Sequence, residues 1–226
     1  MAKDDFVQAN EESVIRLLLI EDDADWTKAV TAYLEREPDM RIVGAAANDE
    51  EALRLADSVV FDVALIDIQL TGSRLDGIGI AMELHERTAA KLIMLTSLND
   101  ERVMTDAFKA GALQYLEKTR FKELPHAIRA ARYHSAPMDA LLKELARLQR
   151  EEQLQRLTAA EREVFELIEA GHTQRQIEKM LFKAESTLKN QVNKMLKKLG
   201  ARSSKEAVAK VKRGGLQRHQ RPKDQG

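Results

Sequence analysis

Up to residue 133 the chain alternates short apolar runs with segments of helical periodicity. The apolar runs are IRLLLI, RIVGAAA, FDVALID, KLIMLT and LQYLEK, and each is followed by a stretch whose apolar residues recur at helical spacing. Unbroken apolar runs are typical of strands covered on both faces, and strict alternation with helices predicts right-handed crossovers between parallel strands. We therefore predict an α/β domain in which helices cover both faces of a doubly wound, five-stranded parallel sheet.

A charged helical pattern follows this region. It starts near Pro137 and reads SAPMDALLKELARLQREEQLQRL. Its apolar positions follow a seven-residue repeat formed by Met138, Leu141, Leu145 and Leu148, which Glu152 ends. About two repeats are too few to predict a coiled coil. We expect a linker helix that packs on either domain, with a dimer contact as the alternative.

The remainder of the chain predicts a second, smaller all-α domain of four short helices. Three of these helices open with the spacing of a capping box, at Thr158 and Glu161, Thr173 and Gln176, and Ser203 and Glu206. The third helix is predicted from about residue 185 to residue 199. Its apolar stripe consists of Leu188, Val192, Met195 and Leu199.

Charge divides the chain at nearly the same place. Residues 1–135 hold 16 Lys and Arg against 25 Asp and Glu, a net charge of −9, and residues 136–226 hold 20 against 12, a net charge of +8. The basic half is suited to nucleic acid and the acidic half to a cation or a basic protein, although ordinary solvated surfaces would look the same. The predicted organisation is a first domain over 14–133, a linker helix over 134–156, a second domain over 157–214, and disordered tails at 1–13 and 215–226.

Composition excludes several classes of protein. The chain has no cysteine, so it has neither a disulfide framework nor a thiolate metal site. Charged residues make up 32% and hydrophobic residues 44%, as in globular proteins. No stretch approaches the roughly 18 apolar residues of a membrane span, and the polar first residues lack the apolar core of a signal peptide. We expect a cytoplasmic protein with no membrane partner.

Chemically active side chains follow the apolar runs. They are Glu21, Asp22 and Asp23 after the first run, Asp67 after the third, Thr96 and Ser97 after the fourth, and Lys118 after the fifth. The carboxyl ends of parallel strands lie along one edge of a sheet, so these groups can converge. Clustered carboxylates need a cation, and a site made only of oxygens suits Mg²⁺. For Asp23 or Asp25 taken alone, capping of the following helix is the favoured interpretation.

This order of an acidic pair, Asp, Thr and Lys resembles the receiver domain of response regulators over residues 14–133, which implies a flavodoxin-like fold. By this resemblance Asp67 is the phospho-acceptor, which attacks a phosphohistidine of a sensor histidine kinase. Glu21 and Asp22 would hold Mg²⁺ together with Asp67, and Lys118 would contact a phosphoryl oxygen. Such a domain assists only its own phosphorylation and dephosphorylation, so we do not expect an enzyme.

The resemblance also implies switch residues, and some positions depart from it. Thr96 and Tyr115 match the hydroxyl and the aromatic side chain that respond to the new phosphate. Thr71 stands where many receivers have Pro, and the segment TGSRLDG predicts a wider loop beside the site; Thr119 replaces another common Pro. A metal-dependent phosphatase with an Asp nucleophile is the enzyme alternative, but it usually has a second Asp where this chain has Gln69.

The segment from LTAAEREVFELIEAG to SSKEAV resembles the LuxR-type helix-turn-helix of NarL/FixJ-family regulators. In that family the second helix of the motif enters the major groove. The resemblance implies a set of DNA-contacting residues on this helix, namely Thr187, Lys189, Asn190, Asn193, Lys194 and Lys197. Amide side chains suit base edges and ammonium groups suit phosphates.

Four positions depart from the LuxR-type pattern. Glu178 replaces a small Ala, Lys183 an apolar residue, Ala184 a capping Ser, and Gln191 a frequent His. Loss of the cap would cost about 0.5–2 kcal/mol unless Glu185 or Ser186 replaces it, while the Glu and the Lys would face solvent or pair with each other.

The two resemblances together predict a phosphorylation-controlled transcriptional regulator of a two-component system. We expect it to dimerise when phosphorylated and to bind double-stranded DNA. A phospho-switched adaptor, whose divergent helix-turn-helix contacts proteins, stays open as the alternative.

Overall fold

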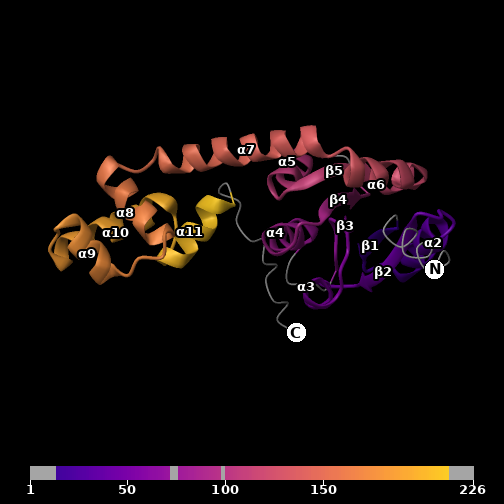
Figure 1. The fold of residues 1–226 in the computed structure, drawn as a ribbon, viewed down its shortest axis with the longest axis horizontal. Helices are drawn as coiled ribbons and strands as arrows, with labels where there is room; N and C mark the ends of the chain where they lie inside the picture. The colour runs from indigo at the N-terminus through magenta and orange to yellow at the C-terminus, as the bar shows by residue number, and fades with distance from the viewer. Residues whose placement is uncertain (1–13, 72–75, 98–99, 214–226) are drawn as a thin grey trace, which may run out of the picture. The chain divides into compact units, whose positions relative to one another are not determined.

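The computed structural model describes residues 14–71, 76–97 and 100–213, which fall into two compact units divided after Leu142 (Figure 1). The first unit is an α/β domain and the second is all-helical. The tails predicted to be disordered and the middle of the loop predicted to be wide, residues 72–75, lie outside the described residues. In the part of the chain that is described, no helix is long and apolar enough to cross a bilayer.

The first unit contains the predicted parallel sheet. Among the described residues its strands are β1 Ile15–Ile20, β2 Met40–Ala46, β3 Val63–Asp67, β4 Lys91–Thr96 and β5 Ala112–Glu117. They pair in parallel in the order β2-β1-β3-β4-β5. Ile20 pairs with Ile66, and Asp67 pairs with Leu95. This register aligns the carboxyl ends of the strands at one edge, as the pattern predicted.

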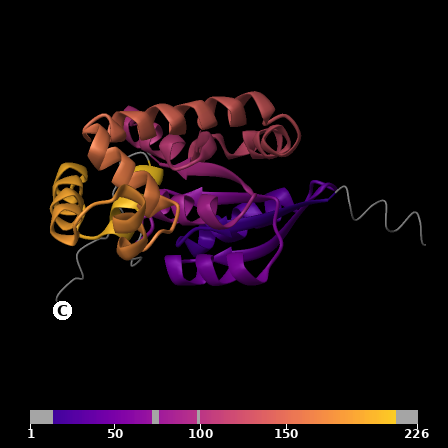
Figure 2. The same ribbon diagram turned by 60° about the vertical axis from the view of Figure 1, so that its left-hand side comes forward.

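Helices flank both faces of this sheet (Figure 2). They are α2 Ala24–Leu34, α3 Asp49–Ser58, α4 Gly77–Arg87, α5 Glu101–Lys109 and α6 Leu124–Tyr133, the last preceded by a 3₁₀ turn, η1 Lys118–Glu123. Buried residues of α2 and α6 share one cluster with alternate residues of the strands. On the other face α4 packs between α3 and α5. Helices α2 to α5 each begin where an Asp or Asn side chain accepts backbone amides of the first turn.

The predicted linker is a helix, α7 Ala136–Leu154. At its start, Asp139 accepts two bonds from Lys91 Nζ, at 2.8 and 3.0 Å, and Leu142 packs against the core of the first unit. Its later turns belong to the second unit, where Arg150 forms a two-bond ion pair with Glu169, each bond 2.8 Å. Leu141 of the predicted repeat is exposed, and a dimer contact there stays a prediction.

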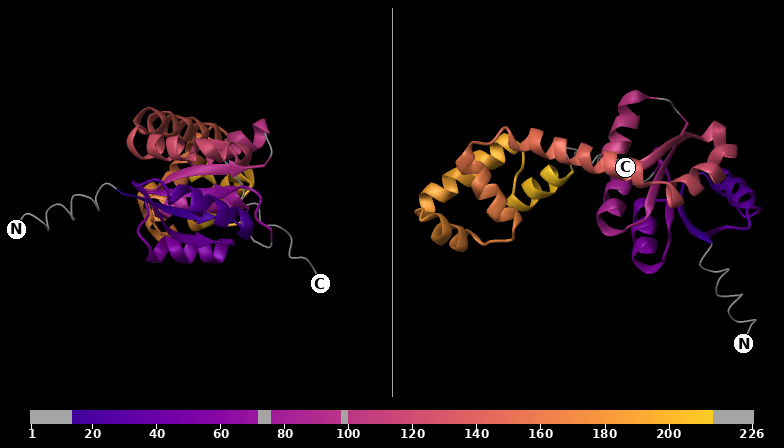
Figure 3. Two further views of the ribbon diagram at one scale, coloured as in Figure 1. Left: turned by 90° about the vertical axis from the view of Figure 1, so that its right-hand side faces the viewer. Right: turned by 45° about the horizontal axis from the view of Figure 1, so that its top comes forward.

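In the second unit the described helices are α8 Ala159–Glu169, α9 Gln174–Leu181, α10 Glu185–Leu199 and α11 Ser204–Lys212 (Figure 3). The bounds of α10 confirm the predicted third helix. Its apolar stripe is buried at Leu188, Met195 and Leu199 and packs into two clusters with α8, α9 and α11. The predicted capping box of α8 is present, since Thr158 and Glu161 each bind the backbone amide of the other.

Candidate functional site

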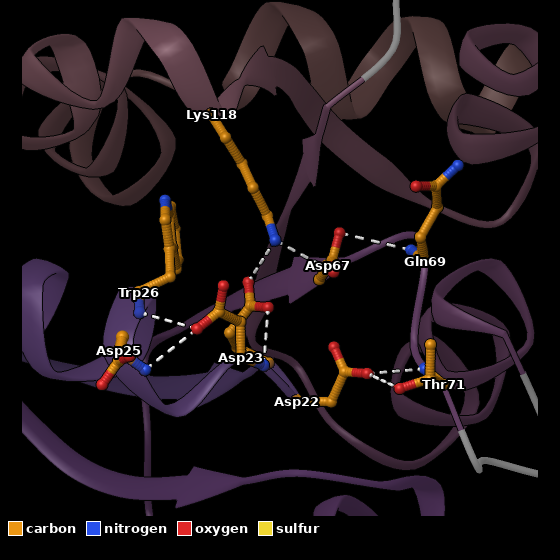
Figure 4. A network of polar contacts seen from close by, with 9 residues as sticks. Asp22, Asp23, Asp25, Trp26, Asp67, Gln69, Thr71 and Lys118 are labelled. Atoms are coloured by element: carbon orange, nitrogen blue, oxygen red, sulfur yellow. Dashed lines mark hydrogen bonds and ion pairs between the residues drawn. The ribbon is translucent and has the colours of Figure 1, made fainter.

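Three carboxylates from two strand ends meet at the carboxyl edge of the sheet (Figure 4). Glu21 and Asp22 follow β1, and Asp67 is the last residue of the adjacent strand β3. One oxygen from each of the three lies within 4.8 Å of the others. Glu21 and Asp67 are buried, and Asp67 Oδ1 accepts the Gln69 amide at 3.2 Å. The structure thus brings together the acidic residues that the sequence predicted to bind a metal.

Lys118 faces these carboxylates from the first residue after β5. Its Nζ lies 2.6 Å from Glu21 Oε2 and 3.0 Å from Asp67 Oδ2. The same ammonium lies 4.8 Å from the centre of the Trp26 ring. The predicted lysine is therefore in direct contact with the predicted phospho-acceptor.

The ionisation of the site reflects burial and an excess of negative charge. Burial is the main cause that raises the pKa of Glu21; the charge of Asp67 adds to it, and the Lys118 ammonium opposes it. Burial alone would lower the pKa of Lys118, but Glu21 and Asp67 outweigh it and raise that pKa. Lys118 is therefore a cation facing more negative charge than it can neutralise.

The donor set fits a hard divalent cation. With Lys118 protonated and the three carboxylates ionised, the four groups carry a net charge of −2. Glu21 Oε2 lies 2.6 Å from Lys118 Nζ, and Glu21 Oε1 accepts the Asp23 backbone amide at 3.1 Å. Clustered carboxylate oxygens are what Mg²⁺ prefers. Glu21, Asp22 and Asp67 are the residues that would hold it.

Asp23, which follows the acidic pair in the sequence, is a helix-capping residue. Its Oδ1 accepts the backbone amides of Asp25 at 2.9 Å and Trp26 at 3.0 Å, and so caps α2. Asp25 itself lies in the first turn of α2, and its carboxylate is 3.6 Å from Lys28 Nζ. The capping interpretation is confirmed for Asp23 and wrong for Asp25.

The predicted switch residues lie on β4 and β5. Thr96 ends β4 and is buried, one residue beyond the Leu95 that pairs with Asp67. Tyr115 is half-buried in β5 and pairs with Met94. Their positions agree with the predicted order along the sheet edge, while their response to phosphate stays a prediction.

The predicted DNA-contacting residues are all exposed on α10. They are Thr187, Lys189, Asn190, Asn193, Lys194 and Lys197. The apolar stripe of the same helix is buried, so its polar residues are left for a partner. Lys198 is bound within the domain, because its Nζ lies 2.6 Å from Glu161 Oε2. The helix can therefore offer amide and ammonium donors without losing its packing.

Comparison with known proteins identifies both halves of the chain. Residues 17–129 match the response regulator receiver domain, and residues 155–211 match the bacterial regulatory proteins of the luxR family. Transcriptional regulatory protein LiaR of Bacillus subtilis (strain 168) is 34% identical over 211 residues, which cover 90% of this chain and 99% of LiaR. The chain is a response regulator of the NarL/FixJ family.

Other relatives agree with this assignment. The regulator is 31% identical to the nitrate/nitrite response regulator protein NarL of Escherichia coli (strain K12), over 86% of this chain and 94% of NarL. A Salmonella typhimurium RcsB response regulator structure covers 90% of this chain and 100% of its own with a TM-score of 0.51; at 18% identity it supports the fold. A response regulator with a luxR-family domain is a phosphorylation-controlled transcriptional regulator, so the adaptor alternative is not favoured.

Thr71 is a site residue of the regulator whose contact the sequence did not reveal. Its backbone amide donates to Asp22 Oδ2 at 2.7 Å, and its hydroxyl donates to the same oxygen. Although burial opposes ionisation of Asp22, these bonds outweigh it and lower the pKa of this carboxyl. Proline, common here in receivers, has neither donor. The departure from the family pattern thus ties the loop after β3 to the acidic pair.

Gly77 is a second residue that sequence reasoning missed. It begins α4, and its amide donates to Ile68 O at 3.1 Å. A Cβ at this position would lie 1.9 Å from the carbonyl oxygen of Asp67, so only glycine allows this close approach. The signal in the sequence is the Asp-Gly pair before the helix, where Asp76 Oδ1 caps α4 through the Gly79 amide at 2.8 Å.

The departures in the helix-turn-helix have distinct structural outcomes. Glu178 and Lys183 were expected to face solvent or to pair with each other; the ion pair that Lys183 forms is with Glu163 of α8, at 3.7 Å. Ala184 occupies the N-cap of α10 and, in the described structure, no side chain caps that helix in its place. Phe182 before it is 96% exposed with a left-handed backbone, φ 51°.

Proposed function

We propose that Asp67 of this regulator accepts a phosphoryl group from a sensor histidine kinase. The observation that supports this most directly is a buried Asp67 carboxylate between an acidic pair and Lys118, whose Nζ is 3.0 Å from Asp67 Oδ2. A carboxylate oxygen attacks phosphorus, the P–N bond to the kinase histidine breaks, and the electron pair remains on the imidazole nitrogen. The product is an acyl phosphate on Asp67.

The other residues of the site orient the phosphoryl group and neutralise its charge. Glu21, Asp22 and Asp67 would hold Mg²⁺, which would supply positive charge to the phosphoryl oxygens. Lys118 contacts a phosphoryl oxygen, because its ammonium already lies beside Asp67. The regulator acts on no separate substrate; it assists only its own phosphorylation and dephosphorylation.

Phosphorylation then controls the output domain. The Thr96 hydroxyl donates to the new phosphate and the Tyr115 ring follows, which repacks one face of the receiver. That change favours a homodimer, whose paired α10 helices contact double-stranded DNA at a two-fold related operator. The exposed lysines of α10 support phosphate contacts and its exposed Asn190 and Asn193 support base contacts. This function places the regulator in the cytoplasm with its DNA.

The test is selection of genomic DNA fragments by full-length protein activated with beryllium fluoride and Mg²⁺. Asp67→Ala, treated in the same way, is the control. Enrichment of one two-fold motif by the activated wild-type protein alone is the expected result, with recovery that falls steeply as salt rises. Equal, motif-free recovery by both proteins would overturn the proposed control of specific DNA binding.

A phosphorylation assay separates the receiver chemistry from the output. Full-length protein is incubated with phosphoramidate and Mg²⁺, and the gain of one phosphoryl group is read by mass spectrometry. The wild-type protein should gain it and Asp67→Ala should not. Phosphorylation of Asp67→Ala would remove Asp67 as the acceptor, whatever the DNA selection shows.

A further inference from the structure

A tryptophan ring lies against Lys118, the lysine proposed to contact the phosphoryl group. Trp26, the one tryptophan in the sequence, lies in the first turn of α2, and Lys118 Nζ is 4.8 Å from the centre of its ring (Figure 4). This distance is within the roughly 6 Å over which a ring face attracts a cation. The Lys118 side chain is only 14% exposed, so water screens this attraction weakly.

The ring itself is held in place by its surroundings. The Trp26 backbone amide donates to Asp23 Oδ1 at 3.0 Å, in the cap of α2. Its side chain is half-buried and packs against the core cluster shared by α2, α6 and the sheet. An ammonium on a flexible four-carbon stem therefore meets a ring whose position is set by the packing of α2 on the core.

This contact has a consequence for the reaction. Before phosphorylation, Glu21 and Asp67 fix the Lys118 ammonium through ion pairs of 2.6 and 3.0 Å. Metal binding and the attack on phosphorus engage the charge of the same two carboxylates, which weakens their hold on Lys118. The contact with Trp26 involves neither carboxylate, so it does not depend on the charge that the metal and the phosphorus engage.

We propose that Trp26 is a positioning residue for phosphoryl transfer, whose ring face keeps the Lys118 ammonium directed at Asp67 while the carboxylates are engaged. This inference rests on the proposed role of Asp67 as acceptor. It assigns Trp26 no contact with the phosphoryl group; the ring acts through Lys118.

The chain offers a graded test, because a single tryptophan allows one ring to be altered by biosynthetic labelling alone. Full-length protein is produced with tryptophan carrying zero, one, two or three ring fluorines, each of which withdraws electron density from the ring face with little change in shape. The rate constant for phosphorylation at saturating phosphoramidate and Mg²⁺ should fall stepwise, by about three- to tenfold over the series. The thermal unfolding midpoint should stay constant.

Substitutions supply an independent readout. Trp26→Phe retains an aromatic face, so its phosphorylation rate constant should stay close to that of the wild-type protein. Trp26→Leu has no aromatic face, so its rate constant should fall as far as that of the protein with three ring fluorines. A rate constant independent of fluorine content, or one that falls only together with the unfolding midpoint, would overturn the positioning role. Absence of phosphorylation in the unlabelled protein would instead defeat Asp67 as the acceptor, so the two failures are distinct.

Discussion

Lys118 Nζ lies 3.0 Å from Asp67 Oδ2 and joins the end of β5 to the end of β3. The strand register sets the position of Asp67, and the 3₁₀ turn after β5 sets that of Lys118. The Lys118 ammonium faces the carboxylates of the site. Its removal leaves the three candidate metal ligands in place, so the role of the lysine can be measured separately from that of the metal.

Replacing Lys118 by methionine should affect metal binding and phosphorylation in opposite directions. Lys118→Met leaves the site one charge more negative, so Mg²⁺ should bind more tightly, as measured by calorimetry. Phosphorylation by phosphoramidate should slow by at least tenfold, since a phosphoryl oxygen loses its ammonium partner. Lys122→Met is the matched control, because this exposed lysine lies in the same turn. An unchanged rate in Lys118→Met would exclude the lysine from the step.

Removing the Thr71 donors should make Asp22 a stronger metal ligand. Thr71→Val removes the hydroxyl donor and Thr71→Pro removes the amide donor as well, so the Asp22 carboxylate has fewer bonds to give up when it binds Mg²⁺. The affinity should rise in the order Thr, Val, Pro, by about three- to tenfold overall. Equal dissociation constants measured by calorimetry for the three proteins would contradict a restraining role for Thr71.

A methyl group at Gly77 should displace the phospho-acceptor. In Gly77→Ala the new Cβ would meet the Asp67 carbonyl oxygen at 1.9 Å, so the start of α4 or the end of β3 must shift. We expect the receiver to lose about 1–3 kcal/mol of stability and to be phosphorylated more slowly. Gly44→Ala is the control, because its Cβ would meet the movable end of Leu18 at 3.1 Å, away from the site. Equal rates and unfolding midpoints for the two variants would count against this reading of Gly77.

The sequence predicted the sheet and the convergence of the strand-end residues because both follow from periodicity, whereas the roles of these residues came from the resemblance to receiver domains. Apolar runs identify buried strands, and residues at the ends of parallel strands must share an edge, which places Asp67 near Glu21 without knowledge of any side-chain position. The bounds of α10 were also predicted, since its apolar stripe is continuous.

The contacts that periodicity does not determine were not predicted. The bonds from Thr71 to Asp22 depend on the path of a loop, and the ring of Trp26 beside Lys118 depends on two side-chain rotamers. Lys183 pairs with Glu163 because α8, which is distant in sequence, packs beside the turn.

Restoring the missing cap should stabilise the recognition helix. Ala184 already has the extended backbone of an N-cap, φ −66° and ψ 146°, but no oxygen to accept an amide of the first turn. Ala184→Ser supplies that oxygen and should stabilise α10 by about 0.5–2 kcal/mol. Hydrogen exchange of the first-turn amides of α10 in the full-length protein measures this directly, with Ala184→Val as a control of similar size. Exchange rates that match those of the control would show that the cap does not form.

The buried Glu161 should make the stability of the second unit decrease at acidic pH. Burial opposes its ionisation, but Lys198 Nζ at 2.6 Å and the Thr158 amide at 2.8 Å outweigh burial and lower the pKa of this carboxyl. Because the folded-state pKa lies below the unfolded value of about 4.3, the stabilisation is complete above that value and is lost as the pH falls through the folded-state pKa.

Glu161→Gln should therefore destabilise this unit at neutral pH and remove part of its acid sensitivity. The amide cannot form the ion pair with Lys198 and does not titrate, so the variant and the wild-type protein should approach equal stability at low pH. Hydrogen exchange of α8 and α10 amides in the full-length protein, followed from about pH 7 to about pH 3, measures both effects. Glu163→Gln is the matched control on α8, because its carboxylate is largely exposed and lies 3.7 Å from Lys183. A constant difference between Glu161→Gln and wild type across this range would mean that the carboxylate contributes through packing and not through its charge.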